Sequence, residues 1–172
     1  MIQIDRASRP RSWRRLNATS RRRANTPTNR QSPNGSEPMN GIILDTSVVI
    51  AAEKGKLDLN GLLGRQQPCP IAIAAITLSE LLHGVERADT TARGKARAAW
   101  LESFRATVTI IDFDEGCARV HAKLWAKLEA AGERIGAHDM LIAATALTHN
   151  MRVATCNAGE FKRVANLKVI TP

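Results

Sequence analysis

The sequence predicts an α/β fold in which a parallel sheet lies between layers of helices. From residue 41 onward, short apolar runs alternate with longer helical stretches, which is the pattern of parallel strands joined by helical crossovers. Hydrophobic residues make up 44% of the 172 residues, and a domain of about 150 residues buries roughly 70% of its unfolded surface. Aromatic residues make up only 3%, so the core of this predicted fold must be aliphatic.

Five short apolar runs are the predicted strands. The run GIILD at residues 41–45 and the run at 70–74 are continuously apolar, as expected of strands that are buried on both faces of a parallel sheet. The predicted strands cover residues 41–45, 70–74, 108–112, 152–154 and 167–170.

The segments between these strands are the predicted helices. Leu78, Leu81, Leu82 and Val85 recur at i, i+3, i+4 and i+7, so they form one apolar helical face. Another long helix ends at Gly132, a residue type that commonly terminates helices. The predicted helices cover residues 47–54, 58–65, 77–88, 91–106, 114–131, 139–149 and 158–164.

Residues 1–38 differ from the rest of the chain in charge and composition. They hold nine Arg against Asp5 and Glu37, a balance of +7, whereas the other 134 residues hold 16 basic and 14 acidic groups. Their polar, aperiodic composition predicts disorder. Three interpretations stay open: an RNA-binding arm, an organelle-targeting peptide, or the product of an upstream start codon. We favour the last because Met39 directly precedes the first predicted strand. The predicted domains are thus an Arg-rich extension at 1–38 and a folded domain at 39–172.

Cysteine usage and hydropathy predict a cytoplasmic protein. Cys69, Cys117 and Cys156 match no zinc or CxxC spacing, and no secretory signal is visible, so we expect reduced thiols. The longest apolar run, at about 140–147, is much shorter than the roughly 20 residues that a membrane span requires. We therefore expect no membrane partner.

Four acids lie where a predicted strand or loop leads into a helix. They are Asp45, Glu80, Asp139 and Glu160. In open α/β sheets the ligand crevice lies beyond the carboxyl ends of the strands, so such positions are candidates for a functional site.

Helix capping is the alternative explanation at three of the four positions. Asp45 or Thr46 can cap the helix that follows it. Thr77 and Glu80 have the spacing of a capping box, and Asn157 stands at the same distance before the fourth acid. Taken singly, capping is the preferred interpretation of Glu80 and of the fourth acid.

Asp139 is harder to explain as a cap. It begins a helix that is apolar on almost every side from Met140 to Leu147, which predicts a buried helix. A carboxylate at the end of a buried helix is partly desolvated and needs a partner. A metal ion, an Arg or a set of backbone N–H groups would each serve.

The four acids together favour a site for Mg²⁺ or Mn²⁺. Hard cations prefer oxygen ligands, and carboxylates crowded together repel one another unless a cation lies between them. Their convergence depends on the order of the strands, which the sequence pattern leaves open.

The chain from about residue 41 to 171 resembles the PIN domain, and most closely the VapC ribonuclease toxins of bacterial toxin–antitoxin pairs. The resemblance rests on four ordered blocks: ILDTSVVI, ITLSELLHGV, IGAHDMLIAATAL and VATCNAGEFKRVANLKV. Each block carries one of the four acids. Two positions depart from the family pattern, because Glu160 stands where Asp is frequent and Cys156 where Arg or Asn is common.

The resemblance implies a three-layer α/β/α fold and metal-dependent endonucleolytic cleavage of RNA, often tRNA or rRNA. It also implies a homodimer and a VapB-like antitoxin whose C-terminal segment blocks the acidic groove. Asp45 and Asp139 would be the principal Mg²⁺ or Mn²⁺ ligands. Glu80 would orient the attacking water or bind the metal, and Glu160 would complete the site directly or through a water. The residues expected to position these carboxylates are Thr46, Ser47, Thr155 and Asn157.

Two other functions compete with a nuclease. The chain could be a non-catalytic RNA-binding regulator that uses its basic N-terminal arm, with the four acids serving as caps. It could also be a phosphatase with a nucleophilic Asp, but such enzymes usually carry a second Asp two residues later, where this chain has Ser47.

Several conspicuous residues receive a structural interpretation. We expect surface or loop packing for His138, with contact to substrate as the alternative because it adjoins Asp139. A basic stretch between two helices is expected to be a solvated face, with phosphate contact as the alternative; it contains Arg87, Arg93, Lys95 and Arg97. The aromatic residues expected to be core or dimer contacts are Trp100, Phe104, Phe113, Trp125 and Phe161.

Overall fold

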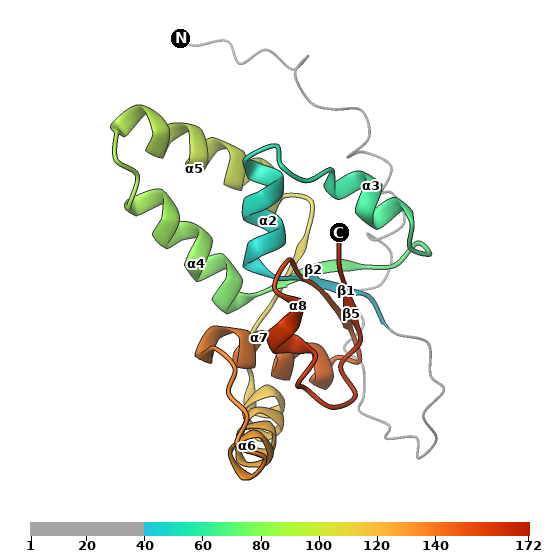
Figure 1. Cartoon of the computed structure of the whole chain (residues 1–172). Helices are drawn as coiled ribbons and strands as arrows, with labels where there is room; N and C mark the ends of the chain where they lie inside the picture. The colour runs from blue at the N-terminus through green and yellow to red at the C-terminus, as the bar shows by residue number, and fades with distance from the viewer. Residues whose placement is uncertain (1–39) are drawn as a thin grey trace. The chain divides into compact units, whose positions relative to one another are not determined.

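The computed structural model describes residues 40–172, and the predicted Arg-rich extension lies outside the described residues. The centre of the domain is a five-stranded sheet in the order β3-β2-β1-β4-β5, with every neighbouring pair parallel (Figure 1). The strands are β1 (Ile42–Leu44), β2 (Ile71–Ala74), β3 (Thr109–Ile111), β4 (Arg152–Ala154) and β5 (Val169–Ile170). The predicted α/β fold with a central parallel sheet is confirmed.

Helices cover both faces of this sheet. Figure 1 shows α2 and α3 on one side and α6 and α7 on the other. Their bounds lie close to the predicted ones: α2 (Thr46–Glu53), α3 (Leu59–Gly64), α4 (Ala75–Glu86), α5 (Thr91–Arg105), α6 (Glu115–Ala130), α7 (Ala137–Thr148) and α8 (Ala158–Phe161). Among the described helices, none is long and apolar enough to cross a membrane.

The core follows from the alternation of side chains along the central strands. Ile43 is paired with Ala72 and Val153 in the sheet, and all three contribute to one buried cluster with α6 and α7. Ile42 and Leu44 point to the opposite face and are also fully buried. Burial of each such aliphatic side chain contributes about 1.5–3 kcal/mol. The members of the cluster are Ile43, Ala72, Ala74, Leu124, Leu128, Ile142, Ala143, Ala146, Met151, Val153, Phe161 and Val164.

The order of the strands places the topological switch point of the sheet between β1 and β4. From the central β1 the chain adds β2 and β3 on one side, and it then returns to add β4 and β5 on the other. The register pairs Leu44 with Ala154, and the Asp45 N–H donates to the Ala154 carbonyl at 2.9 Å. In open α/β sheets ligands bind beyond the carboxyl ends of the strands at such a switch point, so a site is expected where β1 and β4 end.

The two predicted capping boxes are wrong. Helix α4 begins at Ala75, immediately after β2, and its N-cap Ala74 makes no side-chain cap. Thr77 is consequently inside the helix and fully buried. Asn157 does precede α8, but it makes no side-chain cap. Glu80 and Glu160 therefore do not owe their positions to capping.

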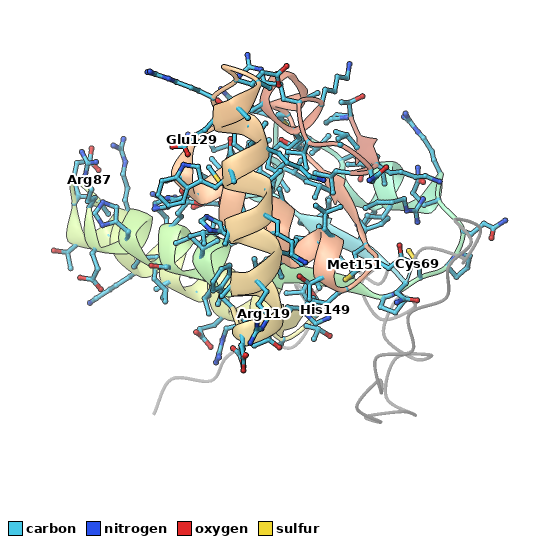
Figure 2. All side chains as sticks on the ribbon, turned by 90° about the horizontal axis from the view of Figure 1, so that it is seen from below. Cys69, Arg87, Arg119, Glu129, His149 and Met151 are labelled. Carbon is cyan, nitrogen blue, oxygen red and sulfur yellow. The ribbon has the colours of Figure 1, made fainter. Side chains whose placement is uncertain are left out.

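Core positions are confirmed for two of the aromatic residues that were expected to be core or dimer contacts, and dimer contact stays a prediction for the exposed ones. Phe104 and Phe161 are buried, whereas Phe113 is 40% exposed and Trp125 is 51% exposed. The His121 ring makes edge contacts with both exposed rings at centroid distances of 5.9 Å. Trp125 is an exposed residue of α6. This helix is seen in front in Figure 2, where its residues Arg119 and Glu129 are labelled.

An ion pair joins three helices on the other side of the domain. Arg97 of α5 donates through Nε and Nη2 to the two carboxylate oxygens of Glu53 in α2, at 2.7 and 3.0 Å. Its Nη1 donates to the Gly84 carbonyl of α4 at 2.7 Å. The lack of a side chain at Gly84 permits this approach, because a Cβ there would lie 3.0–3.2 Å from the guanidinium atoms. Arg97 is thus engaged within the fold.

We predict that Arg97→Ala lowers the free energy of unfolding by about 1–3 kcal/mol. The substitution removes the two guanidinium N–H groups that donate to the Glu53 carboxylate, whose side chain is only 13% exposed. Arg97→Lys should recover only part of the loss, because an ammonium group cannot reproduce the planar fork. Urea denaturation measures the change. The matched control is Arg93→Ala, which removes an exposed ion pair with Asp89 and should cost about 0.5 kcal/mol or less. Equal losses in the two alanine variants would contradict the prediction.

Candidate active site

The structure brings the four predicted acids to the same edge of the sheet. Asp45 follows β1 and is the N-cap of α2, Glu80 lies in α4, Asp139 is the third residue of α7, and Glu160 lies in α8. Figure 1 shows the beginnings of α2 and α4 next to α7 and α8. The negative charges of the other three acids all act on Asp139. Residues separated by up to 115 positions therefore share one electrostatic environment.

Asp45 is held by hydroxyl groups from two loops. It is only 4% exposed, and its Oδ2 accepts hydrogen bonds from Ser47 Oγ at 2.5 Å and Thr155 Oγ1 at 2.8 Å. These hydroxyls are themselves held by backbone donors, because the Cys156 N–H donates to Ser47 Oγ at 3.0 Å and the Asn157 N–H donates to Thr155 Oγ1 at 2.8 Å. Within residues 40–172 no hydrogen-bond donor engages Oδ1 of Asp45. That oxygen is available for a further ligand.

Glu80 reaches the site from α4 and is held at both carboxylate oxygens. Thr46 Oγ1 of α2 donates to Oε2. His138 Nδ1 of α7 lies 2.7 Å from Oε1. The surface position expected for His138 is confirmed, since its side chain is 54% exposed, but its contact with a candidate site residue was not expected. The only signal in the sequence was that His138 adjoins Asp139.

Glu160 is bound to the loop that precedes α7. The Gly136 N–H donates to its Oε2 at 2.5 Å. The Asn157 side-chain amide lies 3.2 Å from Glu160 Oε1 and 3.4 Å from Asp139 Oδ2, so it bridges the two acids. The Gly136 hydrogen bond, and secondarily the Asn157 amide, lower the pKa of Glu160. The backbone donor at Gly136 had no signature in the sequence.

Asp139 has the most strongly shifted pKa of the site. Partial burial, followed by the charge of Asp45, a hydrogen bond with Glu160 and the charges of Glu160 and Glu80, raises the pKa of Asp139 to about 7. Asp139 is therefore substantially protonated at neutral pH when it has no cationic partner. The site carries more negative charge than its own donors neutralise.

The donor chemistry of the site fits a hard divalent cation. The four acids offer carboxylate oxygens only, which Mg²⁺ and Mn²⁺ prefer, and the raised pKa of Asp139 marks the charge that a cation would neutralise. The carboxylates are, however, turned toward protein donors. Among residues 40–172, no three His, Cys, Asp or Glu side chains are arranged to hold a metal ion. Side-chain rotations would be needed for several carboxylates to share one ion.

Two of the four cationic residues of the basic stretch at 87–97, most of which lies in α5, are engaged in other contacts. Arg93 forms an ion pair with Asp89, and Arg97 is bound to Glu53 and Gly84. The other alternative for this stretch, contact with phosphates, is therefore not supported at these two positions. A cationic residue lies closer to the site: Arg163 donates to the Arg134 carbonyl and acts electrostatically on Glu160.

Comparison with known proteins establishes the family. The model of the PIN domain matches residues 42–167. The chain belongs to the PIN domain family. This PIN domain is 38% identical over 132 residues to "Ribonuclease VapC" of Rickettsia bellii, a match that covers 76% of this chain and 96% of the relative. It is also 30% identical over 98 residues to "tRNA(fMet)-specific endonuclease VapC" of Shigella flexneri, covering 57% of this chain and 72% of that protein.

Solved structures agree with this family assignment. The VapBC2 complex of Rickettsia felis, bound to a DNA fragment from its promoter, contains a chain that is 31% identical to this PIN domain with a TM-score of 0.67. The similarity covers 77% of this chain and 98% of that one. The resemblance to PIN domains and VapC proteins inferred from four sequence blocks is confirmed.

We predict that Asp139→Asn changes how the stability of the metal-free PIN domain depends on pH. A carboxyl group with a pKa of about 7 in the folded state and about 3.9 in the unfolded state binds its proton more tightly when folded. Its contribution is therefore fully present below about pH 4 and is lost as the pH rises through about 7. In EDTA, the unfolding free energy of Asp139→Asn should fall less than that of the wild type between pH 5 and pH 8.

The control for this measurement is Asp112→Asn, at an exposed acid that follows β3 outside the site. Its pH dependence should follow the wild type. If the unfolding free energy of Asp139→Asn depended on pH as steeply as that of the wild type, Asp139 would not carry the expected proton.

Proposed function

We propose that this PIN domain is a Mg²⁺- or Mn²⁺-dependent endoribonuclease and the toxin of a VapBC-type toxin–antitoxin pair. The observation that carries the proposal is the convergence of four carboxylates beside the ends of β1 and β4, three of them at helix starts and Glu80 from the second turn of α4. The relatives named ribonucleases and endonucleases support the reaction class. The proposed domain is residues 39–172, with 1–38 as an extension.

Asp45 and Asp139 are the proposed principal ligands of the cation. Asp45 presents an oxygen that no described donor occupies, and Asp139 has the pKa that a bound cation would lower most. Glu80 orients the attacking water or binds the cation, and Glu160 completes the site. When bound, the cation supplies a water of lowered pKa and neutralises charge that develops on the phosphate.

Four neighbouring residues position these carboxylates. Ser47 and Thr155 fix the orientation of Asp45, and Thr46 holds one oxygen of Glu80. Asn157 bridges Asp139 and Glu160, so it sets the separation of the two acids. Hydrogen bonds to ligating groups of this kind typically change metal affinity by about 10–100-fold.

RNA, a VapB-like antitoxin and a second copy of the chain are the proposed partners. The solved neighbours named VapBC complexes support the antitoxin, since they pair the toxin with its partner. Arg163 beside Glu160 offers a positive charge for an RNA phosphate near the acids. Because the relative from Shigella flexneri is named a tRNA(fMet)-specific endonuclease, tRNA is the first substrate class to test. A cytoplasmic location, expected from cysteine usage, is part of the proposal.

Cleavage of total RNA by the full-length chain tests the proposed function. Discrete cuts should appear with Mg²⁺ or Mn²⁺, disappear in EDTA, and decrease by about 100-fold or more in an Asp45→Asn, Asp139→Asn double variant. The matched control is Asp112→Asn, which makes the same acid-to-amide substitution at an exposed residue outside the site. Circular dichroism checks folding, and mass spectrometry excludes a bound antitoxin.

The competing RNA-binding regulator gives the opposite result. If the double variant and the wild type produced the same RNA pattern with metal present, the four acids would have no catalytic role. Deletion of residues 1–38 would then be expected to abolish RNA binding.

A further inference from the structure

We infer that His138 is a positioning residue for Glu80, which it holds together with Thr46 in the orientation that the proposed site requires. The inference rests on the proposed function and adds a residue to it. It is carried by one contact, between His138 Nδ1 and Glu80 Oε1 at 2.7 Å.

The Glu80 carboxylate is bound by donors from two different helices. Thr46 Oγ1 of α2 occupies Oε2, and His138 of α7 occupies Oε1. An ionised carboxylate only accepts hydrogen bonds, so a hydrogen bond from His138 to an ionised Glu80 requires a proton on Nδ1. With both oxygens held, the carboxylate plane cannot rotate without breaking a hydrogen bond.

Glu80 needs such support more than Asp45 does. Asp45 has a short side chain and lies against the hydroxyls of its own edge of the sheet, at the switch point between β1 and β4. Glu80 instead extends from α4, which follows the neighbouring strand β2. A longer side chain has more rotatable bonds, so its carboxylate must be fixed by partners if it is to act from one place.

Stability of the fold does not explain the contact. The His138 side chain is 54% exposed, and the Glu80 side chain is 29% exposed. A contact with a side chain this exposed contributes little to stability. Loss of the His138 ring should therefore leave the melting temperature almost unchanged, whereas loss of a positioning role should change cation affinity and turnover.

Three substitutions at His138 in the full-length chain separate these roles. His138→Ala removes the donor, His138→Asn places an amide nitrogen at the position of Nδ1, and His138→Gln places it one bond farther away. The matched control is His83→Ala, an exposed histidine on the same helix as Glu80. Mn²⁺ affinity is measured without RNA by calorimetry, and kcat and KM are measured for RNA cleavage.

The expected result is a loss of about 10–100-fold in Mn²⁺ affinity and in kcat for His138→Ala. The KM for RNA should change little, because the contact is made to a protein carboxylate. His138→Asn should recover most of the loss, His138→Gln less, and His83→Ala should match the wild type. Wild-type Mn²⁺ affinity and kcat in His138→Ala would overturn the inference.

A double-mutant cycle with Glu80→Gln distinguishes failure of this inference from failure of the proposed function. If His138 acts through Glu80, adding His138→Ala to Glu80→Gln should cause no further loss. A full additional loss would show that His138 acts independently of Glu80 and would overturn the inference. Full activity of Glu80→Gln alone would overturn the role of Glu80 in the proposed function and this inference with it.

Discussion

The parallel pairing of β1 with β4 is the constraint on which the rest of the site depends. The hydrogen bond from the Asp45 N–H to the Ala154 carbonyl aligns the ends of the two strands. That alignment brings Thr155 within hydrogen-bonding distance of Asp45, although 110 positions separate them. A register shift by one residue would turn every side chain of the shifted strand to the opposite face. The fully buried side chains on both faces of β1 therefore enforce the geometry of the acids.

Mutual repulsion of the acids explains why the site is so rich in hydrogen-bond donors. Carboxylates brought together at the edge of a sheet are unfavourable unless each finds a partner. A hydroxyl group donates to Asp45, and the Gly136 N–H donates to Glu160. The side-chain amide of Asn157 bridges Asp139 and Glu160. Asp139 is the acid for which these donors do not suffice, so it responds by retaining a proton.

The sequence predicted the elements of the fold well because the evidence for them is local. Apolar runs such as Ile42–Leu44 and the apolar helix at Ala137–Thr148 are visible in any short window. The order of the strands is not local, so the convergence of the acids could be expected only through the resemblance to PIN domains. The capping boxes failed for a related reason. Spacing suggested a cap at Thr77, but the chain passes from β2 directly into α4.

The contacts that escaped prediction join residues far apart or involve backbone atoms. His138 and Glu80 are 58 positions apart, and no spacing rule connects them. The donor to Glu160 is the N–H of Gly136, a group that every residue except proline possesses and that no composition reveals. The hydroxyl neighbours Thr46, Ser47 and Thr155 were easier to anticipate, because they directly adjoin the predicted strand ends.

The ion pair at Arg97 has a mechanical consequence for the opening of the site. Helices α2 and α4 are joined near the acids by Thr46 and Glu80, and at the other end of α2 by Glu53, Arg97 and Gly84. The two attachments on α2 are seven residues, or about 10 Å, apart. A helix attached at one point can pivot about it, whereas a helix attached at two points cannot. The two attachments therefore oppose pivoting of α2 against α4, so these two helices should keep their relative orientation when a ligand binds at the acids.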